Sequence, residues 1–565
     1  MLHVRYFAKA AVRRVLRRLG WKTPRRTNRS SPDSGSHNSP PARTLAWVQS
    51  QVAPRGGLKV ASDRSDGYPE VTGYLIPTLL CYGELELAVR CLRWLADVQE
   101  RDGSFVSPEG IPLVFDTAQV LRGLLAGLGV ERRAGECARR AAEYIYSQLV
   151  ENGNGGFGKQ FWYRIPEAVH LYSLPPLRRA GHVFHKPEYI RAADSCFEYY
   201  LEKDGAINLD SLTHFLGYQL DALIDLGRDD IAARHLARLR KEQRSDGAIR
   251  AVGGASWVCT PGLAQLAVCW YKTGQWLAAD RALGWLERRQ EPSGGFLGSY
   301  GEKARYFPEA EIPWAAKFYL DANLLRIQAF FDRTTLVIPR AIHESDGRAQ
   351  AVLSSVRPRN RILDVGCGKG RYLRLIGTAY PDVECLGLDA CDKVLQHLPQ
   401  GIHPVQGSME MIPYRAESFD LVFAVESIEH SSNLAAAVRE ILRVTRPGGT
   451  VILIDKQRSH WGSLDCPPWE YWPDAEELEG LLRGECDDVQ VHEVSYDSQS
   501  KPDGLMLAWK GHKRQTLDSR VKNKGSTRGD FSPESIPRES DLLAVTSSVS
   551  WATNTRSSRP GEEGT

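Results

Sequence analysis

The chain has 565 residues, of which 42% are apolar, 25% charged and 9% aromatic. These values are typical of folded globular proteins, so they exclude a largely disordered, collagen-like or coiled-coil chain, and the length predicts two or three domains. The net charge is only +3, yet ten Lys or Arg residues and no Asp or Glu lie between Met1 and Pro32, which leaves −7 for the rest.

Residues 1–43 are predicted to be a basic amphipathic helix followed by a flexible linker. Apolar residues from Val4 to Leu19 recur at helical spacing, and arginines occupy the opposite face. Three interpretations stay open for residues 1–26: peripheral binding to an anionic membrane surface, a solvated arm, and contact with nucleic acid. The acidic charge of the remaining chain makes nucleic acid the least favoured partner.

The cysteines and the hydropathy favour a cytoplasmic protein, with the basic arm as a peripheral membrane contact. Eleven cysteines occur singly, without a CxxC pair, which is typical of reduced thiols. No window approaches the ~18 consecutive apolar residues of a membrane-spanning helix. The first residues also lack the unbroken apolar core of a secretory signal.

Residues 44–332 repeat a helical pattern that ends in a glycine turn. The turn glycines are 42 to 52 residues apart and are followed two positions later by an apolar residue: Gly103, Gly155, Gly205, Gly247 and Gly294. An earlier variant at Gly67 makes six units. This period is long enough for one helical hairpin per repeat, so we expect an all-α array of about six stacked hairpins.

The Q-x-x-D-G-S-F segment from Gln99 to Phe105 resembles the turn motif of the α/α-toroid domains of terpenoid cyclases and protein prenyltransferases. The resemblance implies a toroid whose inner helices point their N-termini at a central cavity. Tentative acceptor-binding residues at those N-termini are Glu70, Asp116, His170 and His214. Each could equally cap or satisfy a helix start. The chain lacks a D-x-D-D acid string and a convincing set of zinc ligands, so we predict no metal site.

After a linker at residues 333–345, the pattern of residues 346–512 changes to alternating strands and helices. This alternation predicts a parallel α/β sheet with helices on both faces, in a Rossmann-like arrangement. Its first strand ends at Asp364 and leads into Gly366, Gly368 and Gly370. The third glycine comes one residue too early for a dinucleotide fingerprint, which favours a ligand without a pyrophosphate. Asp389 ends the second strand, where a carboxylate can bind the hydroxyls of a ribose.

Four segments in order resemble the class I S-adenosylmethionine-dependent methyltransferases, particularly the small-molecule group of the ubiquinone-biosynthesis methyltransferases. They are LDVGCGKG at 363–370, GLDA at 387–390, P-x-x-x-x-S-F-D at 413–420 with ESIEH behind it, and RVTRPGG at 443–449. The resemblance implies S-adenosyl-L-methionine as the cofactor. The residues that it implies as cofactor-binding are Asp364, Gly366, Cys367, Gly368, Asp389, Ala390, Ser408, Met409, Glu410, Val425 and Glu426.

Two further features bear on the methyl acceptor. His430 in ESIEH is a tentative general base for a hydroxyl acceptor, or else a loop histidine that packs beside the cofactor. The insert after the predicted strand TVILIDK, at residues 450–456, gathers aromatic residues that could form a wall over the acceptor or a plug at the next helix start: Trp461, Trp469, Tyr471 and Trp472. Residues 513–565 contain few large apolar side chains and are predicted to be a disordered tail.

The leading hypothesis is therefore a methyltransferase that acts on a hydroxyl or carboxyl of a small molecule, a lipid-linked intermediate or a glycan, with the toroid binding that acceptor. One alternative is a bifunctional protein whose toroid processes a glycan or an isoprenoid. Another makes the toroid a protein-binding scaffold.

Overall fold

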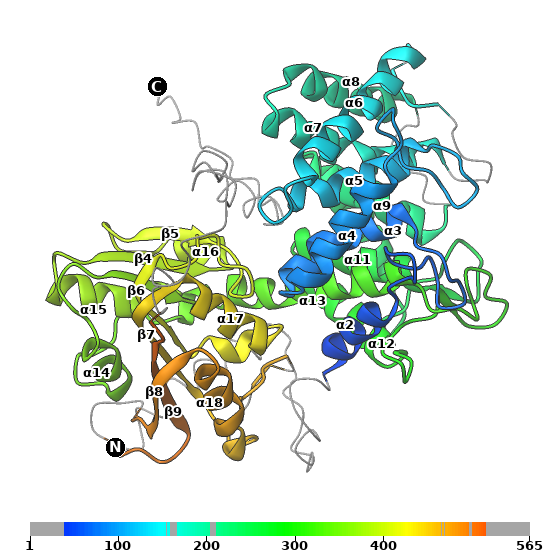
Figure 1. The fold of residues 1–565 in the computed structure, drawn as a ribbon. Helices are drawn as coiled ribbons and strands as arrows, with labels where there is room; N and C mark the ends of the chain where they lie inside the picture. The colour runs from blue at the N-terminus through cyan, green and yellow to red at the C-terminus, as the bar shows by residue number, and fades with distance from the viewer. Residues whose placement is uncertain are drawn as a thin grey trace, which may run out of the picture.

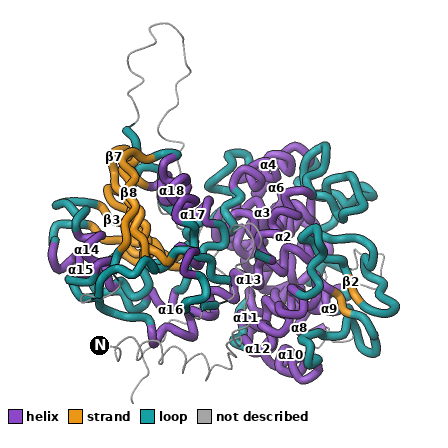
Figure 2. Tube along the Cα trace, turned by 90° about the horizontal axis from the view of Figure 1, so that it is seen from below, coloured by secondary structure: helices purple, strands orange, loops and turns teal. Residues whose placement is uncertain are grey.

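The structure is a computed structural model that describes residues 39–153, 155–158, 166–203, 211–464, 466–467, 469–495 and 500–515. The predicted basic helix with its membrane contact lies outside these residues, as does the predicted tail except for residues 513–515, of which Lys513 ends the last strand and is therefore ordered. The described chain has a helical region up to Thr334 and a region with a large sheet after it. Figures 1 and 2 show these two regions side by side, with the long helix α13 reaching from one to the other.

The helical region consists of two alternating sets of helices. The first set is α3 (Pro69–Cys81), α5 (Val114–Ala126), the 3₁₀ helix η2 (Glu167–Ser173) with α7 (Leu174–Val183), α9 (Thr213–Asp225), α11 (Thr260–Lys272) and α13 (Pro313–Thr334). The second set is α2 (Pro40–Ser50), α4 (Leu85–Val98), α6 (Ala134–Asn152), α8 (Pro187–Lys203), α10 (Asp229–Glu242) and α12 (Trp276–Glu287). A short antiparallel pair joins β1 (Val258–Cys259) to β2 (Ser299–Tyr300).

Helices of the first set contact one another in chain order. Contacts run from α3 to α5, from α5 to η2 and α7, from η2 to α9, and then through α11 to α13, which touches α3 again. Each helix of the second set packs against a member of the first set. The sequence explains this division, because α11 is buried around almost its whole circumference whereas α4 buries a single apolar stripe.

In several of the repeated turns, a glutamine side chain forms a hydrogen bond to the backbone. The Nε2 atoms of Gln99, Gln243 and Gln290 donate to the carbonyl oxygen of the glycine four residues later, at 2.9 to 3.0 Å. Those glycines adopt a positive φ of 91° to 99°, which explains why the turn uses glycine. The prediction for the first unit is wrong, because the backbone at Gly67 has no positive φ and the corresponding glycine is Gly56, at 99°. Gly205 lies outside the described residues.

The second region is a seven-stranded sheet in the order β5-β4-β3-β6-β7-β9-β8. The strands are β3 (Arg361–Val365), β4 (Glu384–Asp389), β5 (His403–Gln406), β6 (Phe419–Val425), β7 (Thr445–Lys456), β8 (Cys486–Glu493) and β9 (Met506–Lys513). The first five strands are parallel, and β9 is antiparallel to both β7 and β8. The chain order reverses between β3 and β6, and the crevice at such a point is where open α/β sheets bind ligands.

Helices cover both faces of this sheet. The helices are α14 (Gly347–Leu353), α15 (Arg371–Ala379), α16 (Asp392–Leu395), α17 (Leu434–Val444) and α18 (Ala475–Arg483), with short 3₁₀ turns η3 (Thr335–Val337), η4 (Ile428–His430) and η5 (Arg458–His460). One apolar core contains residues of α17 and α18, and a second contains residues of α14 and α15. A Rossmann-like architecture is thus present in the described part of this region.

The two regions contact each other directly. Asn433 Nδ2, at the start of α17, donates to Tyr82 O at 3.1 Å and to Glu84 Oε1 at 3.2 Å. At the other end of the junction, Asp332 of α13 accepts a hydrogen bond from Cys391 Sγ at 2.8 Å. Within the described residues, no helix is both long enough and apolar enough to cross a membrane.

Candidate functional site

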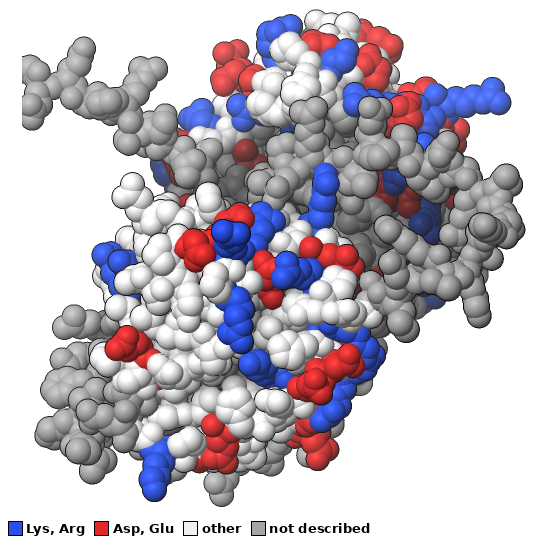
Figure 3. Space-filling view, turned by 60° about the vertical axis from the view of Figure 1, so that its left-hand side comes forward, with Lys and Arg blue, Asp and Glu red and all other residues white. Residues whose placement is uncertain are grey.

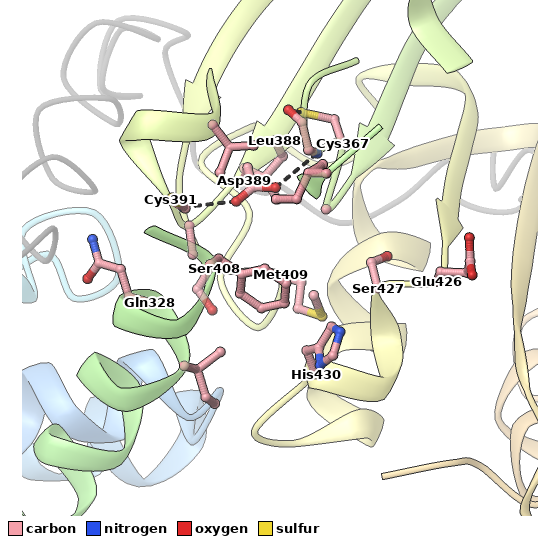
Figure 4. Close-up of a pocket in the computed structure, with 18 of the residues that line it drawn as sticks. Gln328, Cys367, Leu388, Asp389, Cys391, Ser408, Met409, Glu426, Ser427 and His430 are labelled. Carbon is pink, nitrogen blue, oxygen red and sulfur yellow. Dashed lines mark hydrogen bonds between the residues drawn. The ribbon is translucent and has the colours of Figure 1, made fainter. Parts of the chain in front are cut away.

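A cavity of about 670 Å³ opens at the reversal point of the sheet, and both regions of the chain line it. Loops that follow β3, β4, β5 and β6 form one side, and α13 with the segment after it forms the other. Figure 4 shows labelled residues reaching this space from several directions, with Gln328 on α13, Asp389 and Cys391 after β4, and His430 after β6. Every cofactor-binding residue predicted from the sequence lines the cavity except Asp364.

The loop after β3 approaches a neighbouring loop closely. Gly366 has a φ of +76°, and a Cβ added there would lie 2.4 Å from Ser427 Cβ. Ser427 Oγ in turn donates to Val365 O at 2.7 Å. Only glycine fits this position, since any side chain would push the two cavity walls apart.

Asp389 is anchored at the end of β4 by two backbone amides. Gly368 N donates to its Oδ2 at 3.0 Å and Cys391 N donates to its Oδ1 at 2.9 Å. Burial raises the pKa of Asp389 above its ordinary value, while these amide hydrogen bonds lower it. A carboxylate held in this way at a strand end can accept hydrogen bonds from a ribose.

Asp364 lies behind the glycine loop rather than in the cavity lining. Its side chain is 1% exposed, and its Oδ2 has no hydrogen-bond partner among the described residues. Burial raises the pKa of Asp364 well above its ordinary value, and the nearby guanidinium of Arg371 lowers it. The buried carboxyl group could support the loop that holds the methionine portion of a cofactor.

Glu426 holds two arginines at the end of β6. Arg348 Nη1 and Arg371 Nη2 each lie 2.6 Å from Glu426 Oε2. Burial alone would raise the pKa of Glu426, but the two guanidinium groups hold it far below its usual range. Glu426 also has a φ of +53°, which is uncommon for a residue other than glycine and typical of functional sites.

The segment predicted to read the adenine is tied to the next loop. Glu410 accepts hydrogen bonds from Ser408 Oγ, from Ser431 Oγ at 2.8 Å, and from Ser432 N at 2.7 Å. These bonds join the loop after β5 to the loop after η4. Glu410 and the Ser408 hydroxyl are therefore both used to hold the cavity wall together.

His430 lies at the end of the cavity against the helical region. Its ring is 4.8 Å from the ring of Phe331 in an edge-to-face arrangement, and its Nε2 is 3.5 Å from Glu429 Oε1. Burial and the positive charge of Lys456 lower the pKa of His430 to about 3. The imidazole is therefore neutral near pH 7, and its Nδ1 has no hydrogen-bond partner among the described residues.

A cluster of carboxyl groups around Lys456 lies behind His430, and sequence reasoning missed it. The ammonium of Lys456 pairs with Glu429, with Glu470 at 3.3 Å, and with Asp455 at 4.0 Å. Burial raises the pKa of Glu429 to about 8, against the attraction of Lys456 and with repulsion from Glu470. The signal that could have revealed this cluster was the pair of Asp455 and Lys456 at the end of an otherwise apolar strand, because charged side chains are rarely buried unless they are paired.

The aromatic residues of the insert do not line this cavity. Trp461 and Trp472 pack edge to face at 5.2 Å, and Trp472 lies 5.7 Å from Lys456 Nζ. Trp469 packs against Phe330 at 5.2 Å, and Tyr471 OH donates to Glu477 Oε2 at 2.6 Å. The insert thus covers the Lys456 cluster and contacts α13, so within the described residues the structure does not show it as a wall of this cavity.

Helix α13 supplies one wall of the cavity. Leu324, Ile327, Gln328 and Phe331 all line the cavity, and they lie on one face of the helix. The helix has 22 residues, compared with 13 in α3, α5, α9 and α11. This extra length, visible as an apolar stripe running past the last repeat, was the signal that sequence reasoning overlooked.

Three of the four candidates in the helical region lie near one another. Tyr68 OH donates to Asp116 Oδ2 at 2.6 Å, and both Asp116 and Glu70 interact with Tyr218. Burial raises the pKa of Asp116 to about 7 and that of Glu70 well above its ordinary value. The ring of His214 is 4.6 Å from that of Tyr218.

Other polar candidates have different surroundings. His170 is fully buried with its ring 5.1 Å from Phe157, and burial lowers its pKa to about 3. Glu167 accepts a hydrogen bond from Tyr200, and Glu311 accepts one from Trp47 Nε1 at 2.8 Å. None of these groups lines the cavity at the sheet.

Comparison with known proteins assigns residues 363–453 to a family described as a methyltransferase domain. A malonyl-acyl-carrier-protein O-methyltransferase of Methylococcus capsulatus is 36% identical over 110 residues, which are 18% of this chain and 40% of that protein. A ubiquinone/menaquinone biosynthesis C-methyltransferase of Pseudomonas putida is 27% identical over 172 residues, 28% of this chain and 66% of that protein. The chain therefore matches less than two thirds of the length of these relatives.

Solved structures include partial matches at low identity. The cyclase SpnF covers 34% of this chain and 96% of its own, with 19% identity and a TM-score of 0.29. A SAM-dependent methyltransferase from Aquifex aeolicus covers 30% of this chain and 92% of its own, with 16% identity and a TM-score of 0.25. The matched family and the relatives imply S-adenosylmethionine as the cofactor of the second region.

Proposed function

We propose that the protein is an S-adenosylmethionine-dependent methyltransferase that modifies a hydroxyl or carboxyl of a small molecule, a lipid-linked intermediate or a glycan, and that the helical region binds this acceptor. The observation that carries the proposal is the shared cavity. Methyltransferase motif loops form one of its walls, and α13 of the helical region forms another.

The residues present fit the cofactor. Asp389 is held by two amides at the position for the ribose, and the Gly366 loop admits close approach of a ligand. Ser408 and Met409 would border the adenine, and Glu426 would border the methionine portion. When bound, the cofactor supplies an activated methyl group with a good leaving group, so the chain mainly has to position the acceptor.

His430 and Phe331 would position that acceptor. They close the end of the cavity where the two regions meet, and their rings are in contact. A neutral imidazole can accept the proton of a hydroxyl acceptor. Its low pKa makes it a weak base on its own, which fits a role that depends on neighbouring groups.

We further propose that the helical region is an α/α toroid of six hairpins. Support comes from the contact between α13 and α3, which joins the last helix of the first set to the first, and from the second set outside it. The buried pair of Glu70 and Asp116 keeps a glycan- or isoprenoid-processing toroid as a second candidate, because neighbouring carboxyl groups with raised pKa values are typical of acid–base sites.

Isothermal titration with S-adenosylmethionine tests the proposal. We expect binding by the parent protein, and a loss of at least about tenfold in affinity for Asp389→Ala, since one charge-assisted hydrogen bond contributes about 1.5 to 3 kcal/mol. Asp382→Ala, an exposed residue of the same region, is the matched control and should bind normally. Absence of binding by the parent protein would refute the proposal.

A further inference from the structure

The acceptor side of the cavity is apolar. Leu324, Ile327 and Phe331 of α13 line it, and Val337, Ile338 and Pro339 of the following segment continue the same surface. Gln328 is the polar exception on the cavity-facing part of α13. Such a surface favours an apolar body at about 25 cal/mol per Å² buried and has few partners for the hydroxyls of a sugar ring.

The charged groups at the methyl-accepting end are predominantly acidic. Behind His430, three carboxyl groups share the single ammonium of Lys456: Glu429, Asp455 and Glu470. Glu429 itself reaches the cavity, and its Oε1 lies 3.5 Å from His430 Nε2. A carboxylate on the acceptor would be added to this acidic cluster in a buried space, which is unfavourable.

We infer that the acceptor is an apolar molecule that presents a neutral hydroxyl to His430, with α13 binding its apolar body. This inference rests on the proposed function and narrows it, since it excludes glycans and carboxylic acids as acceptors. It also makes α13, rather than the aromatic insert, the element that selects the acceptor.

A hydroxyl acceptor loses its proton during methyl transfer, and the site contains a group that can accept it. As the acceptor oxygen forms its bond to the methyl carbon, the electron pair of the breaking carbon–sulfur bond stays with sulfur, and the hydroxyl proton must leave. His430 would accept that proton, and Glu429 Oε1, 3.5 Å from His430 Nε2, would accept a hydrogen bond from the protonated ring. Glu429 acts through His430 and is thus a positioning residue.

Matched probes test this inference on the full chain saturated with S-adenosylhomocysteine. At pH 7.5 we would titrate 4-butylphenol, which is neutral, 4-butylbenzoate, which has the same apolar body with a carboxylate, and methyl β-D-glucoside. We expect 4-butylphenol to bind at least about tenfold more tightly than the other two, a difference of about 1.4 kcal/mol. Equal or tighter binding of the benzoate or the glucoside, or no binding of the phenol, would overturn the inference.

Variants locate the binding surface. Ile327→Ala and Phe331→Ala should each weaken phenol binding about fivefold or more while changing the affinity for S-adenosylhomocysteine by less than about twofold, and Leu336→Ala, 92% exposed, should change neither. If phenol binding is unchanged in both α13 variants, α13 is not the selector. If S-adenosylhomocysteine itself fails to bind, the proposed function fails instead.

Discussion

Glu429 is a buried acid that keeps its proton at neutral pH. Burial raises its pKa from 4.5 to about 8, whereas in the unfolded chain it ionises near the ordinary value. Between these two pH values the folded state binds a proton that the unfolded state has released, so this group makes stability fall as the pH rises from about 4.5 to about 8.

Replacing Glu429 with glutamine should therefore flatten the dependence of unfolding free energy on pH. We expect the loss of stability between pH 5 and pH 8.5 to be smaller in Glu429→Gln than in the parent protein, because glutamine does not ionise. Urea unfolding at several pH values measures this difference. Identical slopes for the two proteins would show that Glu429 has an ordinary pKa.

Glu426 is the opposite case, an ionised carboxylate that joins two arginines. Its removal in Glu426→Gln leaves the guanidinium groups of Arg348 and Arg371 without that partner, and the side chain is only 28% exposed. We expect Glu426→Gln to lower the free energy of unfolding by about 3 kcal/mol. This value is at the lower end for breaking a buried ion pair, because the Glu426 side chain is partly exposed. Chemical denaturation measures it.

The pair of Arg361 and Glu384 provides a matched control for that variant. It has a similar distance of 3.0 Å, but its side chains are 30% and 48% exposed. Glu384→Gln should cost less than about 1 kcal/mol, as is usual for surface ion pairs. Equal costs for the two variants would contradict the structural role of Glu426.

At the scale of secondary-structure elements, the start of α17 both caps a helix and joins the two regions. Asn433 Oδ1 accepts from Ala436 N at 3.2 Å, while its Nδ2 donates to Tyr82 and Glu84 across the junction. Asn433→Asp keeps the capping oxygen but places a carboxylate beside Glu84. Asn433→Ser keeps a cap without adding charge.

We expect Asn433→Asp to weaken the junction by about 1 to 3 kcal/mol, the cost of leaving such groups unpaired, and Asn433→Ser to weaken it less. Differential scanning calorimetry should then show the two regions unfolding in more separate steps in the aspartate variant than in the parent protein. A single unchanged transition in both variants would mean that this contact does not couple the regions.

The elements differ in how well the sequence predicted them. The loop after β3 was predictable, because three glycines that follow an apolar strand and an aspartate are typical of a ligand-binding loop. Gly366 confirms the need for glycine, since a Cβ added there would collide with Ser427. The acceptor wall was not, since residues such as Phe331 have the pattern of an ordinary buried helix face. Phe331 meets His430 only because α13 crosses from one region into the other, a tertiary contact that local patterns do not encode.

Local sequence patterns also failed to place the aromatic insert and the turn of the first repeat. Trp472 was predicted either to face the acceptor or to plug the next helix start, and its ring lies 5.7 Å from Lys456 Nζ, a charge whose burial the sequence did not reveal. In the first repeat, the Asp-Gly pair at residues 66–67 imitates the turn motif, whereas the turn itself uses Gly56. A short motif therefore predicts which residue type a turn needs more reliably than it predicts where the turn lies in the sequence.

At the scale of the whole molecule, charge is distributed unevenly along the chain but is mixed on the described part of one face of the folded molecule. Figure 3 shows basic and acidic side chains interspersed over the face in view, without a continuous field of one sign. The ten basic residues before Pro32 are therefore the strongest concentration of one charge in the sequence. Each could contribute about 1 kcal/mol near an anionic membrane surface.

Deletion of residues 1–26 should accordingly reduce binding to vesicles that contain phosphatidylserine. We expect the full chain to sediment with such vesicles at low salt and to be released as the salt concentration rises, because screening weakens the attraction. Neutral phosphatidylcholine vesicles are the control. Equal sedimentation of the deleted and full-length proteins would contradict a membrane role for the arm.

The central claim is that both regions build one ligand site, and hydrogen exchange tests it most directly. On addition of S-adenosylhomocysteine together with 4-butylphenol to the full chain, we predict slower amide exchange in residues 363–370, 387–391 and 425–432, and also in residues 324–334 of α13, whose side chains line the same cavity. Protection confined to the sheet region, with no change in α13, would contradict the claim.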